Sequence, residues 1–367
     1  MISDSQLQKT ARNIIRKSMF VKEKEAVIIS AGPNSLDFAE KLAYEAAIIG
    51  ANPTITYGTD ELSLKIYNDT KMKYLKTIPK LSRIFAKKTD VQIMLEDSNP
   101  SVAKKLPQKK VQVRIKALEP IRKIREKRVL NKTIKSVLVG FPNKETAKSL
   151  GISYRRLNKI FWDTLSMDPY KLSKINERVI KKLGNADKIR IVGKGTDLEF
   201  SVKGRKPIND CGLWVKDKIG YLNLPAGEVF YAPVETSANG EIYFDMPCMW
   251  HFGKQVEGVW FKFKNGRVVD YRIKKGLKNF EDVFHNATKD KDRIAELGIG
   301  TNPKAKFTRG LTIVDEKLRG TIHIAIGDNV MFGGKNKSSM HWDFFKNMKR
   351  GKMYVDGKLF MKKGKII

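Results

Sequence analysis

The chain has 367 residues, of which 41% are hydrophobic, and this length is too great for one ordinary domain, so we expect two. Lysine and arginine number 72 against 39 aspartates and glutamates, giving a formal net charge of +33. A charge of this size raises nucleic acid as a partner, but the lysines are spread along the whole chain. We therefore expect a lysine-rich surface and no nucleic-acid interface.

The two cysteines, Cys211 and Cys248, are too few for a disulfide framework and do not form a zinc-finger pattern. Their scarcity favours a reducing, cytoplasmic setting. The first twenty residues lack the apolar segment of a signal peptide, and no run approaches 18 apolar residues. We therefore expect no contact with a membrane.

The first half alternates predicted helices and strands. Helical spacing predicts helices over 5–19 and 36–49, and short apolar runs predict strands at 25–30, 53–57, 90–95 and 136–140. Strand–helix–strand units favour parallel pairing with right-handed crossovers. Residues 1–185 are therefore predicted to form an α/β domain with an open sheet.

Three local features stand out in this half. The turn at 31–35 holds one glycine and lacks the spacing of a phosphate-binding loop, so we interpret it as a strand–helix connection. Residues 104–135 carry 13 basic residues against two acidic ones, and their apolar positions predict a helix with one buried face. Asp168 and Pro169 are typical of the start of a helix, here expected over 169–183.

From residue 186 the pattern changes to short strands separated by turn residues, and we place the domain boundary there. Asn265-Gly266, between two strand-like runs, is a strong hairpin signal. One helix, over 280–297, is expected to interrupt the strands. Residues 186–367 are therefore predicted to form a mostly antiparallel β (α+β) domain.

A candidate metal site lies near the C-terminus. His323 falls in an alternating run over 321–326, which predicts a strand. His341 and Asp343 follow a loop rich in glycine and asparagine, and they share one face of a second extended segment. Two imidazoles and a carboxylate on adjacent strands form a ligand set suited to a divalent transition metal.

Further acidic residues occupy settings that require a partner. Glu228 lies among apolar residues, where an unpaired carboxylate would be costly. Glu296 is expected near the C-terminus of the helix over 280–297, an unfavourable end for a negative charge, so we expect a cation nearby. Together with Asp343 and the two histidines, these acids exceed the needs of one metal and fit two ions that share a bridging carboxylate.

Four segments carry a resemblance to a known family: NLPAGEV within 221–247, AELGIGTN within 293–303, DEKLRGTIHIAIG at 315–327 and HWD at 341–343. They resemble the aminopeptidase T / aminopeptidase S / aminopeptidase II family of metallo-aminopeptidases. The resemblance implies a homodimer that cleaves peptide substrates, with the catalytic metal-binding domain at 186–367. It also implies two divalent ions (Zn, Co, Mn or Mg), held by Glu228, Glu296, His323, His341 and Asp343.

In this resemblance Glu316 falls where the family places a general base. One feature departs from the family. Several members carry a tyrosine shortly after the HIA-G strand, whereas residues 328–332 contain none here. Tyr354 is nearby in sequence.

Three functions compete. The first is metal-dependent hydrolysis of N-terminal residues from peptides. The second is a mononuclear Fe(II) ring-cleaving dioxygenase of the dihydroxypyridine type, because His323, His341 and Asp343 alone form a 2-His-1-carboxylate set. Glu228 and Glu296 favour the peptidase, since a single iron needs neither. The third, a nucleic-acid-binding protein, rests on charge alone and leaves the ligand set unexplained.

Overall fold

The structure is a computed structural model that describes residues 2–215, 220–250 and 254–367. Two compact units are present, and each uses two segments of the chain. The first comprises Met1–Trp162 with Gly212–Leu224, and the second comprises Asp163–Cys211 with Pro225–Ile367. The boundary expected after residue 185 lies inside the second unit, because helix α10 (Pro169–Leu183) belongs with the strands that follow it. As a statement about domains, that boundary stays a prediction.

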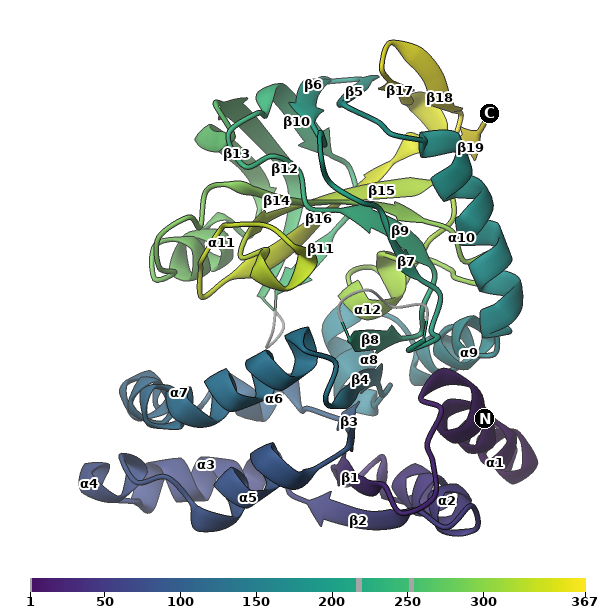
Figure 1. Ribbon diagram of the computed structural model, residues 1–367. Helices are drawn as coiled ribbons and strands as arrows, with labels where there is room; N and C mark the ends of the chain where they lie inside the picture. Colours follow the sequence, from purple (N-terminus) through teal and green to yellow (C-terminus); the bar gives the residue numbers. More distant parts are fainter. Residues whose placement is uncertain (1, 216–219, 251–253) are drawn as a thin grey trace. The chain divides into compact units, whose positions relative to one another are not determined.

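The first unit is an α/β unit built on a parallel sheet of five described strands, in the order β2-β1-β3-β4-β8 (Figure 1). The strands are β1 (Ala26–Ala31), β2 (Asn52–Tyr57), β3 (Val91–Glu96), β4 (Lys135–Gly140) and β8 (Tyr221–Leu224). The four strands predicted in the first half are confirmed. The fifth, β8, was not expected in this sheet, because the sequence analysis assigned its residues to the second half.

The helices of this part of the chain precede the first strand or follow one of the strands in sequence. They are α1 (Asp4–Asn13), which continues as a π-helix (Ile14–Ser18), α2 (Leu36–Ala47), α3 (Asp60–Asp69), α4 (Met72–Leu75), α5 (Lys80–Lys88), α6 (Pro100–Ala103), α7 (Gln108–Leu130), α8 (Lys144–Leu150) and α9 (Tyr154–Leu165). The basic segment is the helix α7, as predicted. It buries Ile121 and Val129 and leaves Leu130 exposed, so its buried face is narrow.

The second unit contains two antiparallel sheets among its described residues. One has the order β11-β12-β10-β6-β5-β17-β18-β19, with β13 paired to β12, and the other has the order β16-β15-β14-β9-β7. The strands of the larger sheet are β5 (Lys188–Gly193), β6 (Thr196–Ser201), β10 (Asn239–Phe244), β11 (Cys248–Trp250), β12 (Lys254–Lys264), β13 (Arg267–Lys275), β17 (Lys352–Val355), β18 (Lys358–Lys362) and β19 (Lys365–Ile366). The smaller sheet consists of β7 (Ile208–Asp210), β9 (Glu228–Tyr231), β14 (Ile294–Gly300), β15 (Thr321–Gly327) and β16 (His341–Asn347).

Aromatic side chains from both sheets form the core of this unit. Phe344 of β16 packs against Phe244 and Phe261 of the larger sheet, with ring centroids 5.5 and 4.8 Å apart. Phe280 and Trp342 join the same cluster. Burial of this apolar surface is the main force that holds the two sheets together and gives the smaller sheet a rigid backing.

Local signals are confirmed at several positions in this unit. Asp168 caps α10 by accepting bonds from two backbone amides, with Pro169 in the first turn. Asn265 and Gly266 both have positive φ in the hairpin between β12 and β13, as a type I′ turn requires. Among the described residues of this unit, the short helices are α11 (Leu277–Phe284), α12 (Thr312–Asp315) and 3₁₀ turns at Val330–Phe332 and Met348–Arg350.

The helix expected over 280–297 is wrong in its second half. Helix α11 ends at Phe284, and residues 294–300 form β14, whose residues are all buried. A strand that is buried on both faces loses the two-residue alternation that identifies strands, so its apolar run resembles a buried helix. The helix-dipole argument for Glu296 therefore fails, although the residue is buried and close to cationic groups.

In the described part of the chain, no helix combines the length and apolar character needed to cross a bilayer. Cys211 and Cys248 are both buried thiols.

Candidate metal centre

Four neighbouring strands of the smaller sheet present the predicted site residues. Glu228 opens β9, Glu296 lies on β14, His323 lies on β15, and His341 and Asp343 lie on β16. These strands are consecutive neighbours in the sheet, so residues as far apart in sequence as Glu228 and His323 become adjacent. Each side chain is thus fixed on a paired strand, which holds a site more accurately than a loop does.

Two glycines in the sequence motifs make room for this arrangement. Gly298 lies opposite His323, and a Cβ atom at Gly298 would lie 2.0 Å from Cε1 of that imidazole. Gly227, which precedes Glu228, has a φ of +134°, and its Cβ would lie 2.5 Å from that of Asn302. Glycine is therefore required at both positions, by close packing at the first and by backbone conformation as well at the second.

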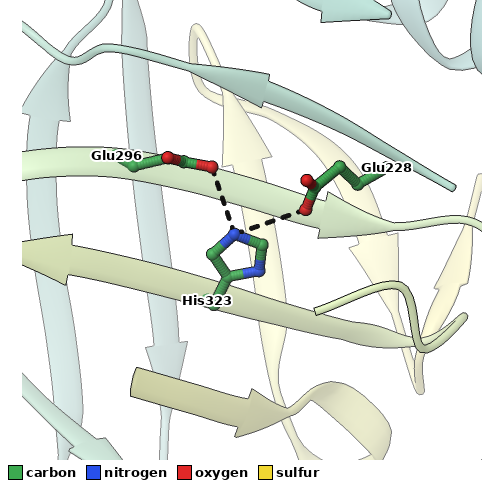
Figure 2. Close-up of side chains that lie close together, drawn as sticks. All are labelled: Glu228, Glu296 and His323. Atoms are coloured by element: carbon green, nitrogen blue, oxygen red, sulfur yellow. Dashed lines mark hydrogen bonds and ion pairs between the residues drawn. The ribbon is translucent and has the colours of Figure 1, made fainter. Parts of the chain in front are cut away.

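The two imidazoles approach the carboxylates through Nε2. His323 Nε2 lies 3.3 Å from Glu296 Oε1 and 3.4 Å from Glu228 Oε2 (Figure 2). His341 Nε2 lies 3.3 Å from Glu296 Oε2 and 3.4 Å from Asp343 Oδ1. Glu296 thus offers one oxygen to each ring and belongs to both of two overlapping groups. In each group the potential ligand atoms lie within 4.8 Å of one another.

A hydrogen bond outside the cluster orients one of the rings. His341 Nδ1 donates to the carbonyl oxygen of Asp328 at 2.7 Å. With that nitrogen carrying the donated proton, Nε2 is the atom left to face the carboxylates. A hydrogen bond of this kind orients metal-binding histidines in proteins.

Burial and neighbouring charges shift the pKa values of the cluster in opposite directions. Burial raises the pKa of Glu228 to about 8, although Lys317 lowers it. Burial also acts to raise the pKa values of Glu296 and Asp343, but the imidazoles outweigh it, so that the pKa of Glu296 is lowered and that of Asp343 falls to about 2. The carboxylates in turn outweigh burial at both imidazoles and raise their pKa values. In the metal-free protein, the raised pKa values therefore favour the protonated, cationic form of both imidazoles, among carboxylates that could hold a metal cation instead.

Glu316 lies beside this cluster and not in either group of potential ligands. It follows α12 directly, in a short helical turn, and its carboxylate is buried. Burial raises the pKa of Glu316 to about 8, opposed by the charge of Lys317. Asp315 has a different role, since its carboxylate accepts bonds from Thr308 and Gly310 and closes the preceding loop.

Two residues that the sequence analysis missed complete the site. Lys317 is fully buried, and its Nζ lies 2.6 Å from Glu228 Oε1, 2.7 Å from Asp210 Oδ2 and 2.8 Å from Glu316 Oε1. Lys317 could have been suspected from its position in the DEK motif. Asp210 carries no comparable signal, because it lies far from the other motifs and only the pairing of β7 with β9 brings it to Glu228.

In the segment after β15, where the family resemblance led us to look for a tyrosine, the aromatic residue is a phenylalanine. Phe332 lies 5.1 Å from the His341 ring and 5.3 Å from Phe230, so it forms an apolar wall beside the imidazole. Tyr354 lies on β17 in the larger sheet, opposite Arg190.

The side chains of this cluster have the chemistry of divalent-metal ligands. Within the described residues, Oε2 of Glu228 and Oδ1 of Asp343 are buried and have no hydrogen-bond partner. A buried carboxylate oxygen without a donor is costly, and a cation removes that cost. Carboxylates and imidazoles are ligands typical of Zn²⁺ and related transition ions. The residues present therefore fit a divalent metal.

Sequence comparisons with known proteins point to a family of peptidases. The family model described as thermophilic metalloprotease (M29) matches residues 3–366. A protein named aminopeptidase T from Thermus aquaticus is 25% identical over 356 residues, which span 88% of this chain and 84% of that protein.

Solved structures show the same fold. Wild-type AmpT from Thermus thermophilus superposes with a TM-score of 0.81 at 23% identity, covering 99% of both chains. A 2,5-dihydroxypyridine dioxygenase from Pseudomonas putida KT2440 gives a TM-score of 0.63 at 15% identity, covering 100% of this chain and 98% of the other. At these identities the likeness concerns the fold, which hosts more than one chemistry.

Proposed function

This chain belongs to the thermophilic metalloprotease (M29) family and is a metallo-aminopeptidase, and we propose that it removes N-terminal residues from peptides with two divalent ions and an activated water. The proposal rests on the charges buried around His323. The same buried charges bear on the two alternatives, a single iron and nucleic-acid binding.

Five buried carboxylates surround the site in the part of the chain that the structure describes: Asp210, Glu228, Glu296, Glu316 and Asp343. Lys317 is the buried cation that pairs with three of them. When all five are ionised, Lys317 balances one negative charge, and two divalent ions balance the remaining four. One divalent ion would leave two buried charges uncompensated, which is strongly unfavourable. The buried cluster of these carboxylates around one ammonium group is the observation that carries the proposal.

The two overlapping groups suggest how the ligands are shared. Glu228 and His323 would hold one ion, and His341 and Asp343 the other. Glu296 would bridge them, because its two oxygens face different rings. The predicted set of five ligands is thus compatible with the geometry, and each ligand role is part of this proposal.

Such a pair of ions lowers the pKa of a bound water and polarises a carbonyl group. Glu316 is the candidate general base. It lies beside Glu228 on the same ammonium group, outside both groups of potential ligands. A carboxylate in this position can accept a proton from the attacking water and return it to the leaving amine.

The dioxygenase alternative is not favoured. A mononuclear iron would use His323, His341 and Asp343, and would leave Glu228 and Glu296 as buried acids without a function. Nucleic-acid binding leaves the whole cluster unexplained. We retain a homodimer as a proposal, which follows from the resemblance.

A metal count combined with activity tests this function. Metal-free protein, prepared with chelator and then reconstituted, should bind two ions of Zn²⁺, Co²⁺ or Mn²⁺ per chain and should cleave leucine p-nitroanilide only after reconstitution. N-acetyl-leucine p-nitroanilide is the matched control and should resist cleavage, because an aminopeptidase requires a free α-amine. Full activity without metal, or one tightly bound iron with ring-cleaving activity, would overturn the proposal.

A further inference from the structure

Lys317 is a charged side chain that is fully buried beside the site and is not part of the proposed ligand set. Its Nζ pairs with carboxylates from three parts of the chain, at 2.6 to 2.8 Å. Desolvation of an ammonium group is costly and is offset only by close, well-placed partners. A buried ion pair that served stability alone could be replaced, both partners together, by well-packed apolar residues. The position of Lys317 therefore indicates a function for its charge.

The two oxygens of Glu228 have different surroundings because of Lys317. Oε1 lies 2.6 Å from the ammonium nitrogen, whereas Oε2 has no hydrogen-bond partner and points toward His323. Lys317 thus occupies one oxygen and leaves the other for an ion. The carboxylate is held as a one-oxygen ligand, with its free oxygen directed to the potential ligand group of His323 and Glu296 (Figure 2).

Asp210 fixes the ammonium from the other side. Asp210 lies opposite Glu228 in the antiparallel register of β7 and β9. The side-chain amide of Asn176 on α10 donates to the backbone carbonyls of both residues, at 3.1 and 2.9 Å, and Thr301 donates to the oxygen of that amide. The two strand ends are therefore locked side by side, and Lys317 bridges their carboxylates.

Glu316 is held by the same cation. Both carboxylates, Glu228 and Glu316, contact the ammonium group of Lys317. Without that positive charge they would be two neighbouring buried negative charges, and their mutual repulsion would drive them apart. The charge therefore keeps a candidate ligand and the candidate base next to each other.

We propose that Lys317, anchored by Asp210, is a positioning residue that holds Glu228 as a one-oxygen ligand to one of the two ions and keeps Glu316 beside it. The inference rests on the proposed function, because it concerns the same pair of ions. This arrangement makes the two ions differ in how strongly their binding depends on Lys317. The ion on the Glu228 side depends on Lys317, whereas the ion held by His341 and Asp343 does not.

Metal titration of Lys317→Met tests this asymmetry, since methionine is an unbranched side chain of similar length that carries no charge. Calorimetry with Mn²⁺ on metal-free protein should give two binding events in the original chain. In the variant we expect one event to be unchanged and the other to weaken by about 10–100-fold, the usual effect of removing a group that orients a metal ligand. At two equivalents of Mn²⁺, the electron paramagnetic resonance spectrum should change from a coupled pair to an isolated ion.

A matched variant separates positioning from stability. Lys135 is also a buried lysine, paired with Glu25 at 2.8 Å and bound to the carbonyl of Phe20, in the other unit. Lys135→Met should lower the unfolding temperature and leave both Mn²⁺ affinities as they are. Asp210→Asn, which retains an acceptor for Lys317, should weaken the same ion as Lys317→Met by a smaller factor, and it decides the question if Lys317→Met does not fold.

The outcomes distinguish this inference from the proposed function. If the original chain binds fewer than two ions or fails to cleave the substrate, the proposed function fails. If it binds two ions and cleaves, but Lys317→Met or Asp210→Asn binds both with the original affinities, the positioning inference fails alone. Equal weakening of both ions would also overturn it, because the asymmetry would be absent.

Discussion

Asp97 in the first unit and Glu228 in the second are both carboxylates beside a sheet, but their hydrogen-bond partners differ. Asp97 follows β3 and accepts bonds from the backbone amides of Asn34 and Ser35, at 2.6 and 2.9 Å, and from the side-chain amides of Asn34 and Asn143. Its oxygens are satisfied by the protein itself, at the carboxyl edge of a parallel sheet where many α/β proteins bind ligands. Gly32 permits this approach, since a Cβ there would lie 2.8 Å from Asp97 Oδ2.

In the second unit the carboxylates face imidazoles and one another. Among the described residues, Glu228 Oε2 and Asp343 Oδ1 are buried without a hydrogen-bond partner, each with an imidazole nitrogen at 3.4 Å, and Lys317 is the one lysine paired with the acids of the site. The difference teaches which buried carboxylates are structural. A carboxylate surrounded by N–H donors closes a loop, whereas a group of carboxylates that lacks donors is organised for cations.

The largest expected effect sharpens this contrast within the second unit. Glu316→Gln retains size and hydrogen bonding but cannot accept a proton, so kcat should fall by about 10²–10⁴-fold while metal content stays the same. Glu296→Gln should instead lower metal occupancy, because that carboxylate is the proposed bridge. Steady-state kinetics with a metal count per chain separates the two. Wild-type kcat in Glu316→Gln would remove it as the base, and loss of metal in that variant would make it a ligand.

The pH dependence of metal affinity is the second test. Burial acts to lower the pKa values of His323 and His341, but Glu296 and Asp343 outweigh it and raise them, so protons compete with metal above the usual range of histidine. The rings must lose these protons to offer Nε2, and affinity should therefore fall as pH falls, by about tenfold per pH unit for each ring that is protonated. Competition titrations with a chromogenic chelator measure this. An affinity that stays flat down to about pH 5 would contradict the arrangement.

Asp97→Asn tests the other side of the comparison. The new amide would place a donor against the backbone N–H groups of Asn34 and Ser35, so the free energy of unfolding should fall by about 1–3 kcal/mol. Metal content and kcat of the folded protein should not change, since Asp97 has no place in the proposed reaction. Urea unfolding provides the measurement, and Glu40→Gln on an exposed face of α2 should shift stability by no more than about 0.5 kcal/mol. A metal-deficient Asp97→Asn protein would break the distinction.

The smallest expected effect concerns the net charge of +33. If the charge is a property of the surface, cleavage of short peptides should be unaffected by added RNA or DNA. Binding to nucleic acid should show no steeper dependence on salt than that of other lysine-rich proteins. A steep log–log salt slope, or inhibition by RNA at low concentration, would give the basic surface a role of its own.

Local chemistry explains how much of the fold was predictable. The strands of the first half, the cap at Asp168 and the Asn-Gly hairpin depend on short-range periodicity and turn geometry, which a sequence contains directly. The prediction failed at residues 285–297, because β14 is buried on both faces and its pattern does not alternate. Strand β8 was not predicted as part of the first sheet, since its parallel pairing with β4 joins residues that are far apart in sequence.

The sequence by itself determined the residue types and motifs of the candidate centre, because a carboxylate and imidazole set with fixed glycines leaves recognisable spacing. Only the tertiary structure decided that Glu296 lies on a strand between the two imidazoles, with one oxygen for each. It alone brought Asp210 to Lys317 and Glu228, since that contact depends on the register of β7 with β9. Residue identity is local information, whereas the charge balance of a buried cluster is set by which strands become neighbours, and strand pairing acts over any separation in sequence.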